Sequence, residues 1–210
     1  RQELGKSKAR PKFTEILSKS RAINVLSAAR MFLFGARDVW FVVALPVYLH
    51  TVFGWDFWKV GGFMAIWIIG YGFIQTLAPR ITGNIEGRQP AVLWAMALAL
   101  VPAAIAVGLT MGWSPRIVIV GGLLLFGVLF AVNSSLHSYL IVSYARGDGV
   151  SLDVGFYYMS NAGGRLLGTI LSGWVYQAYG LEACLWISSG LVATAALLSM
   201  MLPVRAASTT

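Results

Sequence analysis

Long apolar runs separated by short polar segments fill the chain from residue 22 onward. A helix needs about 20 consecutive apolar residues to cross the hydrocarbon core of a bilayer. Six runs fit this requirement, and they cover residues 22–49, 57–78, 91–111, 117–142, 154–178 and 183–202. The pattern predicts an all-α membrane protein with six transmembrane helices, because a helix satisfies all its backbone hydrogen bonds internally.

The first run differs from the others because charged side chains lie well inside it. Arg30, Arg37 and Asp38 all fall within this run, which we expect to kink near Pro46. A charged group at the bilayer centre costs at least ~2.5–3.5 kcal/mol on insertion scales. Two explanations stay open: Arg30 reaches the nearer interface and Arg37 pairs with an acid elsewhere, or these groups face a polar cavity that receives an anion.

Polar residues in the other runs recur at helical spacing. Arg30 and Arg37 are seven residues apart and share a face, as do Asn133 and His137, which are four apart. The fifth run carries a stripe made of Tyr158, Asn161, Arg165, Gly168 and Ser172. The third and sixth runs are almost free of such residues, which suggests two three-helix units of the kind found in transporters built from repeats.

Each of these residues also has a purely structural interpretation. His137 fits a packed histidine bonded to a backbone carbonyl, and Asn133 and Asn161 fit interhelical hydrogen bonds that only join helices. Arg165 fits an ion pair with Asp38, since a lone buried charge is unfavourable. The small residues Gly164, Gly168 and Ser172 form a small-xxx-small pattern that is more typical of helix packing than of ligand contact.

The formal net charge of +8 is concentrated in the segments between the apolar runs. If residues 1–21 form a basic cytoplasmic linker and residues 203–210 a cytoplasmic tail, the inner segments hold eleven Lys or Arg and the outer loops hold only Lys59 and Arg116. This bias follows the positive-inside rule and places both ends in the cytoplasm. With only 11% charged residues and no soluble domain, the chain is not expected to bind nucleic acid.

No pattern in the sequence indicates an enzyme, a cofactor or a metal site. Ser134 and His137 lie on one predicted helix, but the chain has no nucleophile turn around a serine. Cys184 is the only cysteine, and neither a metal-ligand set nor a P-loop is present. We therefore expect no catalytic residue, and keep an intramembrane hydrolase or a purely structural subunit as weaker alternatives.

Several long segments together resemble a known transporter family. The basic lead, the six runs and the glycine-rich segment 163–191 are similar to the C-terminal half of a major facilitator superfamily transporter. Segments 13–49, 51–63, 131–145 and 148–177, including AVNSSLHSYLIVSYA, resemble the organoarsenical efflux permeases of arsenic-resistance operons, the ArsJ type. The loop 79–90 departs from the superfamily signature, because it contains Pro79-Arg80 and Gly87-Arg88 without the expected Asp.

The resemblance implies efflux of an organoarsenical oxyanion such as 1-arseno-3-phosphoglycerate by alternating access, which confers arsenate resistance. It also implies a missing N-terminal six-helix half as partner, and a multi-pass location in the inner (plasma) membrane of a bacterium. Another organic anion, such as a sugar phosphate, is the alternative substrate.

Charge and spacing, rather than the resemblance, select the candidate residues within the membrane. Arg30 and Arg37 are the expected anion ligands, because guanidinium groups bind oxyanions bidentately. Arg165 is expected either as a third ligand or as the partner of Asp38, in an ion pair or a proton site. The expected orienting donors are Asn133, His137 and Asn161.

Overall fold

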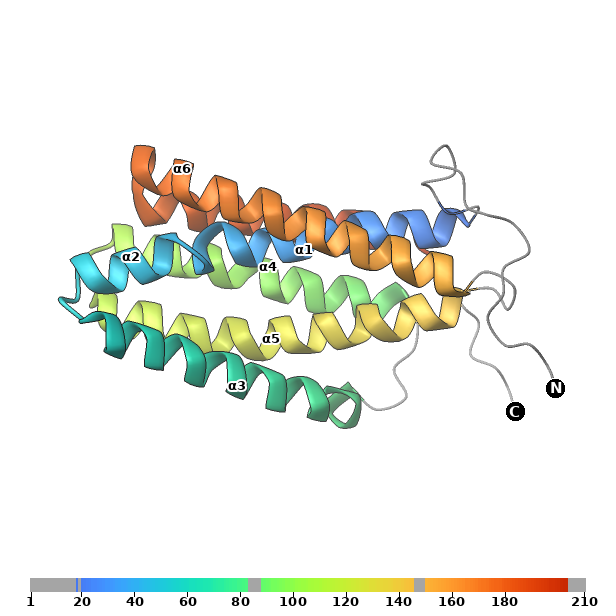
Figure 1. The fold of residues 1–210 in the computed structure, drawn as a ribbon, viewed down its shortest axis with the longest axis horizontal. Coiled ribbons are helices and arrows are strands. Elements are labelled where there is room, and N and C mark those ends of the chain that lie inside the picture. Colours follow the sequence, from blue (N-terminus) through green and yellow to red (C-terminus); the bar gives the residue numbers. More distant parts are fainter. Residues whose placement is uncertain (1–17, 19, 83–87, 146–149, 204–210) are drawn as a thin grey trace.

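The computed structural model describes residues 18, 20–82, 88–145 and 150–203. Within these residues every regular element is a helix: α1 (Arg21–Phe41), α2 (Ala44–Thr51), α3 (Phe57–Thr82), α4 (Arg88–Thr110), α5 (Pro115–Tyr144) and α6 (Val150–Ser199). Five stretches are long and apolar enough to cross a membrane, namely Arg21–Thr51, Phe57–Arg80, Arg88–Thr110, Pro115–Tyr144 and Leu152–Ser199. The protein is thus an all-α bundle with the character of a multi-pass membrane protein (Figure 1).

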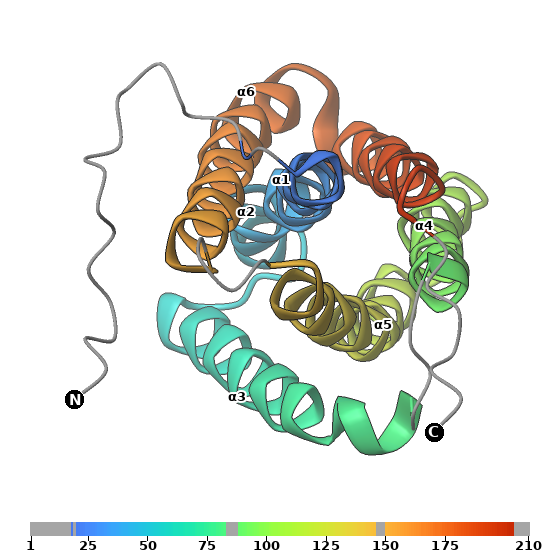
Figure 2. The same ribbon diagram turned by 90° about the vertical axis from the view of Figure 1, so that its right-hand side faces the viewer.

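The longest helix, α6, consists of two limbs that reverse direction at Gly180. This glycine has a φ of 81° and a ψ of −175°, a backbone conformation that side chains with a Cβ rarely adopt. Both ends of α6 reach the start of α1, since Asp153 accepts a hydrogen bond from Ser18 and Leu202 packs in one cluster with Ile23. The limbs therefore correspond to the predicted fifth and sixth runs, and Figure 2 shows them as separate columns.

The first predicted span is divided into α1 and α2 by a break at residues 42–43. The break lies four residues before Pro46, because a proline ring clashes with the carbonyl group of residue i−4. Ser172 of α6 satisfies the amides that the break leaves free. Its hydroxyl oxygen accepts hydrogen bonds from the backbone N–H groups of Val43, at 3.3 Å, and Ala44, at 3.0 Å.

Helix α1 lies between the two limbs of α6 and makes its most extensive contacts with them (Figure 2). Glycines permit this close approach on the first limb. A Cβ on Gly168 would lie 2.6 Å from the carbonyl oxygen of Gly35, and one on Gly164 would collide with the carbonyl group of Met31. On the second limb, Ser188 donates a hydrogen bond of 2.6 Å to the carbonyl oxygen of Ala36. The predicted small-residue pattern thus forms a helix-packing face.

Helix α3 lies at the edge of the bundle, where it packs chiefly against α5 (Figure 1). Trp67 is buried and donates from Nε1 to the carbonyl oxygen of Leu123 at 3.0 Å. In contrast, Trp58, Ile66 and Ile69 are among many large apolar side chains of α3 that are exposed. Helix α3 therefore buries only a narrow strip against α5 and leaves the rest of its apolar surface outside the bundle.

Basic residues at the described ends of the helices separate by side. Arg21 and Arg88 begin α1 and α4 at one end of the bundle, and Arg80 lies in the last turn of α3 at that end. Lys59 and Arg116 lie in the first turns of α3 and α5 at the opposite end. The predicted linker 1–21 and tail 203–210 fall largely outside the described residues, as do the loop positions 83–87 and 146–149.

Candidate anion-binding site

Arg30 is buried in the bundle, with 4% of its surface exposed. Its Nη1 donates a 3.0 Å hydrogen bond to the carbonyl oxygen of Ser134 on α5, and its guanidinium group lies 4.1 Å from the ring centroid of Phe34. The ring of Tyr157 is 5.0 Å away. Nε has no hydrogen-bond partner, and no carboxylate among the described residues pairs with this arginine. A buried cation is therefore held by one carbonyl group and two aromatic rings.

Arg37 and Arg165 share a single carboxylate. Asp38, which is 1% exposed, accepts a 2.6 Å hydrogen bond from Nε of its neighbour Arg37 on Oδ1. Its other oxygen, Oδ2, accepts a 3.2 Å hydrogen bond from Nε of Arg165 on α6. Asp38 thus ties α1 to the first limb of α6, and the structure contains the Asp38–Arg165 pair that the sequence left as one of two options for Arg165.

These contacts leave more positive charge on the three arginines than the Asp38 carboxylate neutralises. Arg30, Arg37 and Arg165 are three cations, and Asp38 is the only carboxylate that pairs with any of them in the described part of the chain. A charge in the membrane interior without a counterion is strongly unfavourable unless water or a ligand reaches it. The arrangement is electrostatically suited to an anion.

The arginines form a graded series from the interior to the surface. Arg30 is buried, the side chain of Arg37 is 13% exposed, and that of Arg165 is 56% exposed. Phe34 links the first two, because the guanidinium groups of Arg30 and Arg37 lie 4.1 Å and 5.0 Å from its ring centroid. The ring of Phe130 stands edge-on to Phe34 at 5.1 Å and contacts Arg37 as well.

The three predicted orienting donors take different positions. Asn133 uses its side-chain NH2 group to join α5 to α4, donating to the carbonyl oxygens of Trp94 and Leu129, both at 2.9 Å. Its role in the structure is therefore helix joining, and the contacts do not connect it to an arginine. His137 is buried with no partner on Nδ1, and Asn161 has a buried Oδ1 without a partner. Oδ1 of Asn133 is likewise buried without a partner, so each of the three side chains has one polar atom with unused hydrogen-bonding capacity.

Sequence reasoning missed two residues that shape the site. Phe34 follows Arg30 by four positions and precedes Arg37 by three, so helical spacing alone places it on the arginine face. Gln75 of α3 donates from Nε2 to the hydroxyl oxygen of Ser134 at 3.4 Å. Gln75 is the only carboxamide in the run 57–78, and that isolation is a signal by which it could have been found.

The contacts of Ser134 and His137 bear on hydrolytic and metal chemistry. Ser134 receives its hydrogen bond from Gln75, and Nδ1 of His137 has no partner among the described residues, so this nitrogen does not activate the serine. No group of three or more His, Cys, Asp or Glu side chains gathers in the described part of the chain.

Comparison with known proteins adds no identification. No protein-family model matches the chain, and no curated protein is significantly similar to it. The chain is an all-α bundle with five helical stretches long and apolar enough to cross a membrane, and its buried cation Arg30 has no paired carboxylate in the described residues.

Proposed function

We propose that this chain is one half of a membrane transporter that binds an organic oxyanion at Arg30, Arg37 and Arg165. The observation that carries the proposal is the charge balance in the bundle, where Asp38 pairs with Arg37 and Arg165, and no carboxylate in the described residues pairs with the buried Arg30. An anion that bridges these groups would remove the excess charge. Guanidinium also suits the geometry of phosphoryl and arsenyl groups, because its planar fork donates two parallel hydrogen bonds.

The contacts of each arginine suggest separate roles in binding. Arg30 has an unpartnered Nε and is oriented by Phe34 and Tyr157, so it is preorganised to receive an acceptor. Arg37 and Arg165 are held by Asp38 and would be shared with an arriving anion. Nδ1 of His137, which has no partner, would donate to the anion in the tautomer that places the ring proton on this nitrogen. The unpartnered Oδ1 of Asn161 is an acceptor, so Asn161 would orient the anion by donating from its side-chain NH2 group. Binding would then divide the hydrogen bonds of Arg37 and Arg165 between Asp38 and the anion at the contact of α1 with α6.

The substrate that we propose is an organoarsenical oxyanion such as 1-arseno-3-phosphoglycerate. Support comes from the resemblance of several segments to organoarsenical efflux permeases and from the oxyanion-binding chemistry of the arginines. The chain would be the C-terminal bundle of a major facilitator superfamily fold in a bacterial plasma membrane, with both of its ends in the cytoplasm. Alternating access requires a second six-helix bundle, which would rock against this one around the arginines.

Arsenate tolerance tests this proposal in cells that lack other arsenic exporters. Cells would express the complete two-bundle transporter containing this chain, together with the glycolytic dehydrogenase that forms the arsenical. We expect tolerance to rise, to fall back in Arg37→Gln, and to persist in the matched control Arg80→Gln at the end of α3, with equal amounts of each protein in the membrane. Unchanged tolerance with the unaltered transporter would contradict the arsenical substrate.

A flux measurement separates the arsenical from another organic anion. A sugar phosphate or the freshly formed arsenical would be added to the solution outside inverted membrane vesicles. Its uptake into the vesicles would be followed by phosphorus and arsenic analysis. Uptake of the sugar phosphate alone would favour the alternative substrate while keeping the arginine site. Uptake of neither, by vesicles that contain folded protein, would refute the transporter.

A further inference from the structure

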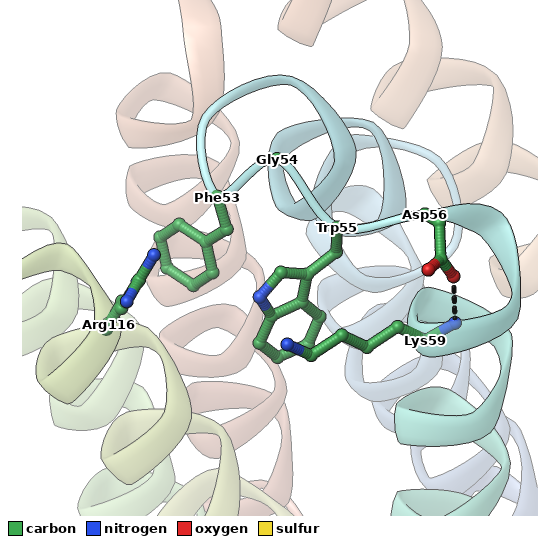
Figure 3. Close-up of a pocket in the computed structure, with 6 residues that line it drawn as sticks. All are labelled: Phe53, Gly54, Trp55, Asp56, Lys59 and Arg116. Atoms are coloured by element: carbon green, nitrogen blue, oxygen red, sulfur yellow. Dashed lines mark hydrogen bonds between the residues drawn. The ribbon is translucent and has the colours of Figure 1, made fainter.

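A second polar feature lies far from the arginines, at the end of the bundle where α3 and α5 begin. A cavity of about 340 Å³ opens there, between the loop that joins α2 to α3 and the first turns of α3 and α5. Its lining residues, shown in Figure 3, are Phe53, Gly54, Trp55, Asp56, Lys59 and Arg116. Nothing in the proposed transport mechanism uses this cavity.

Aromatic rings hold both cations of the cavity. The ammonium group of Lys59 lies 4.8 Å from the ring centroid of Trp55, and the guanidinium group of Arg116 lies 5.8 Å from that of Phe53. Figure 3 shows the Lys59 side chain extending beneath Trp55. Neither cation forms an ion pair with a carboxylate in the described residues. Cation–π contacts orient such groups and leave their N–H donors free for a further ligand.

The single carboxylate of the cavity is already engaged. Oδ1 of Asp56 accepts a 2.7 Å hydrogen bond from the backbone N–H of Lys59, so Asp56 caps the start of α3 (Figure 3). Helix α5 begins at Pro115 with no side-chain cap from Ser114 and no acidic residue in its first turn. Its partial positive charge therefore adds to that of Arg116. Two cations and an uncapped helix end outweigh one carboxylate that serves as a cap.

The surroundings of the cavity place it at the membrane boundary. Phe57 and Trp58 lie between the lining residues Asp56 and Lys59 in the chain, Trp113 lies three residues before Arg116, and all three aromatic side chains are exposed. Exposed tryptophans collect at the level of lipid headgroups. The cations Lys59 and Arg116 suit the oxygens of a phosphate ester. At this level of the membrane such an ester has two sources, the headgroup of an anionic phospholipid and a soluble organic phosphate.

We infer that this cavity is a phosphate-ester site, in which Lys59 and Arg116 bind the phosphate oxygens from two different helices. Trp55 and Phe53 would position the cations and contact the apolar part of the ester. The inference goes beyond the proposed transport function, because it concerns other residues at another depth of the membrane.

Native mass spectrometry of the chain in nanodiscs tests the lipid source. Nanodiscs would hold phosphatidylglycerol and phosphatidylcholine with the same acyl chains, and the retained lipid would be identified after release. We expect phosphatidylglycerol to be retained preferentially, and the preference to fall about fivefold for each cation removed in Lys59→Gln and Arg116→Gln. Arg80→Gln, the same change of charge at the other end of α3, should keep it. Equal retention of both lipids by the unaltered chain would speak against a lipid headgroup.

The soluble source has its own measurement. Glycerol 3-phosphate would be titrated calorimetrically into the chain in nanodiscs of phosphatidylcholine alone, and the double variant Lys59→Gln/Arg116→Gln would be titrated in parallel. Binding by the unaltered chain that the double variant loses would assign the site to a soluble phosphate. If neither the lipid nor glycerol 3-phosphate binds in a way that depends on these two residues, the inference is overturned.

A measurement on the unaltered chain covers the case in which the variants fail to fold. Lipid preference would be recorded at increasing salt concentration, since the screening length falls to about 3 Å near 1 M salt. A preference held by Lys59 and Arg116 should fade as salt rises, and a preference that ignores salt would contradict an electrostatic phosphate site.

Discussion

Nε of Arg165 on α6 lies 3.2 Å from Oδ2 of Asp38 on α1. This contact joins two elements that are far apart in the sequence, and it does so with a carboxylate that is already paired with Arg37. One buried acid thus holds two cations, one of which reaches the surface of the bundle. The structural and the proposed functional roles of these residues depend on the same carboxylate.

Removing the Asp38 carboxylate should destabilise the bundle more than removing either of its partners. Asp38→Asn leaves Arg37 without its counterion, and breaking a buried pair in this way costs about 3 kcal/mol. Arg165→Gln should cost less than about 1 kcal/mol, because its side chain is 56% exposed. Denaturant titration in detergent measures both. Glu182→Gln, which changes a half-buried acid outside this pair, is the control, and equal effects of the three variants would contradict the assigned pairing.

Arg30 should be unfavourable for stability even though we assign it to anion binding. Its charge is buried with one hydrogen bond and no paired carboxylate. Arg30→Met should therefore leave the free energy of unfolding unchanged or raise it by up to about 4 kcal/mol. The carbonyl group of Ser134 keeps its place in the helix when the arginine is lost.

Arg30→Met should lower export by the complete transporter, although it should not destabilise the fold. We expect a loss of about tenfold or more, because a hydrogen bond to a charged group contributes about 1.5–3 kcal/mol. Arg30→Lys tests whether charge alone suffices, and we expect it to recover little, because lysine lacks the planar group that stacks on Phe34. A strongly destabilised Arg30→Met would instead mark this arginine as a structural residue.

Two adjacent glycines of α6 should respond oppositely to the same substitution. Gly164→Ala places a Cβ against the backbone carbonyl group of Met31 and should destabilise the fold by about 1–3 kcal/mol. Gly163→Ala meets open space and should be neutral or stabilising by up to about 1 kcal/mol, because alanine favours helix. Thermal unfolding of both variants gives the comparison. Similar midpoints would mean that α1 and α6 are not in close contact at Gly164.

Ser172→Ala should weaken the junction between α1 and α2. The hydroxyl oxygen is the acceptor for the amides of Val43 and Ala44 at the break, and losing it should cost about 1–3 kcal/mol. Ser199→Ala is a matched control, since that buried hydroxyl only donates back to the carbonyl oxygen of Ala195 in its own helix. We expect the control to cost less than Ser172→Ala, because no backbone amide depends on the Ser199 hydroxyl as its acceptor. Hydrogen exchange at residues 42–46 should accelerate in Ser172→Ala alone.

Hydropathy alone determined the class of protein and most of its elements. Apolar runs predicted the bounds of α3, α4 and α5 within a few residues. They also predicted a fifth and a sixth span, which the structure forms as the two limbs of α6. This works because each segment must satisfy its backbone hydrogen bonds and its lipid contacts by itself. Residue spacing also placed Arg30 and Arg37 on one face of α1, since that relationship lies within a single helix.

The tertiary structure decided every contact between helices. Sequence spacing left Arg165 as either a ligand or the partner of Asp38, and only the approach of α6 to α1 brings the two within 3.2 Å. The same holds for Asn133, whose amide turns to Trp94 on α4, and for Ser172, which reaches the break before Pro46. Helical periodicity gives the direction of a side chain around its own axis, but the rotation and depth of the neighbouring helix come from packing at close-approach points such as Gly164 and Gly168.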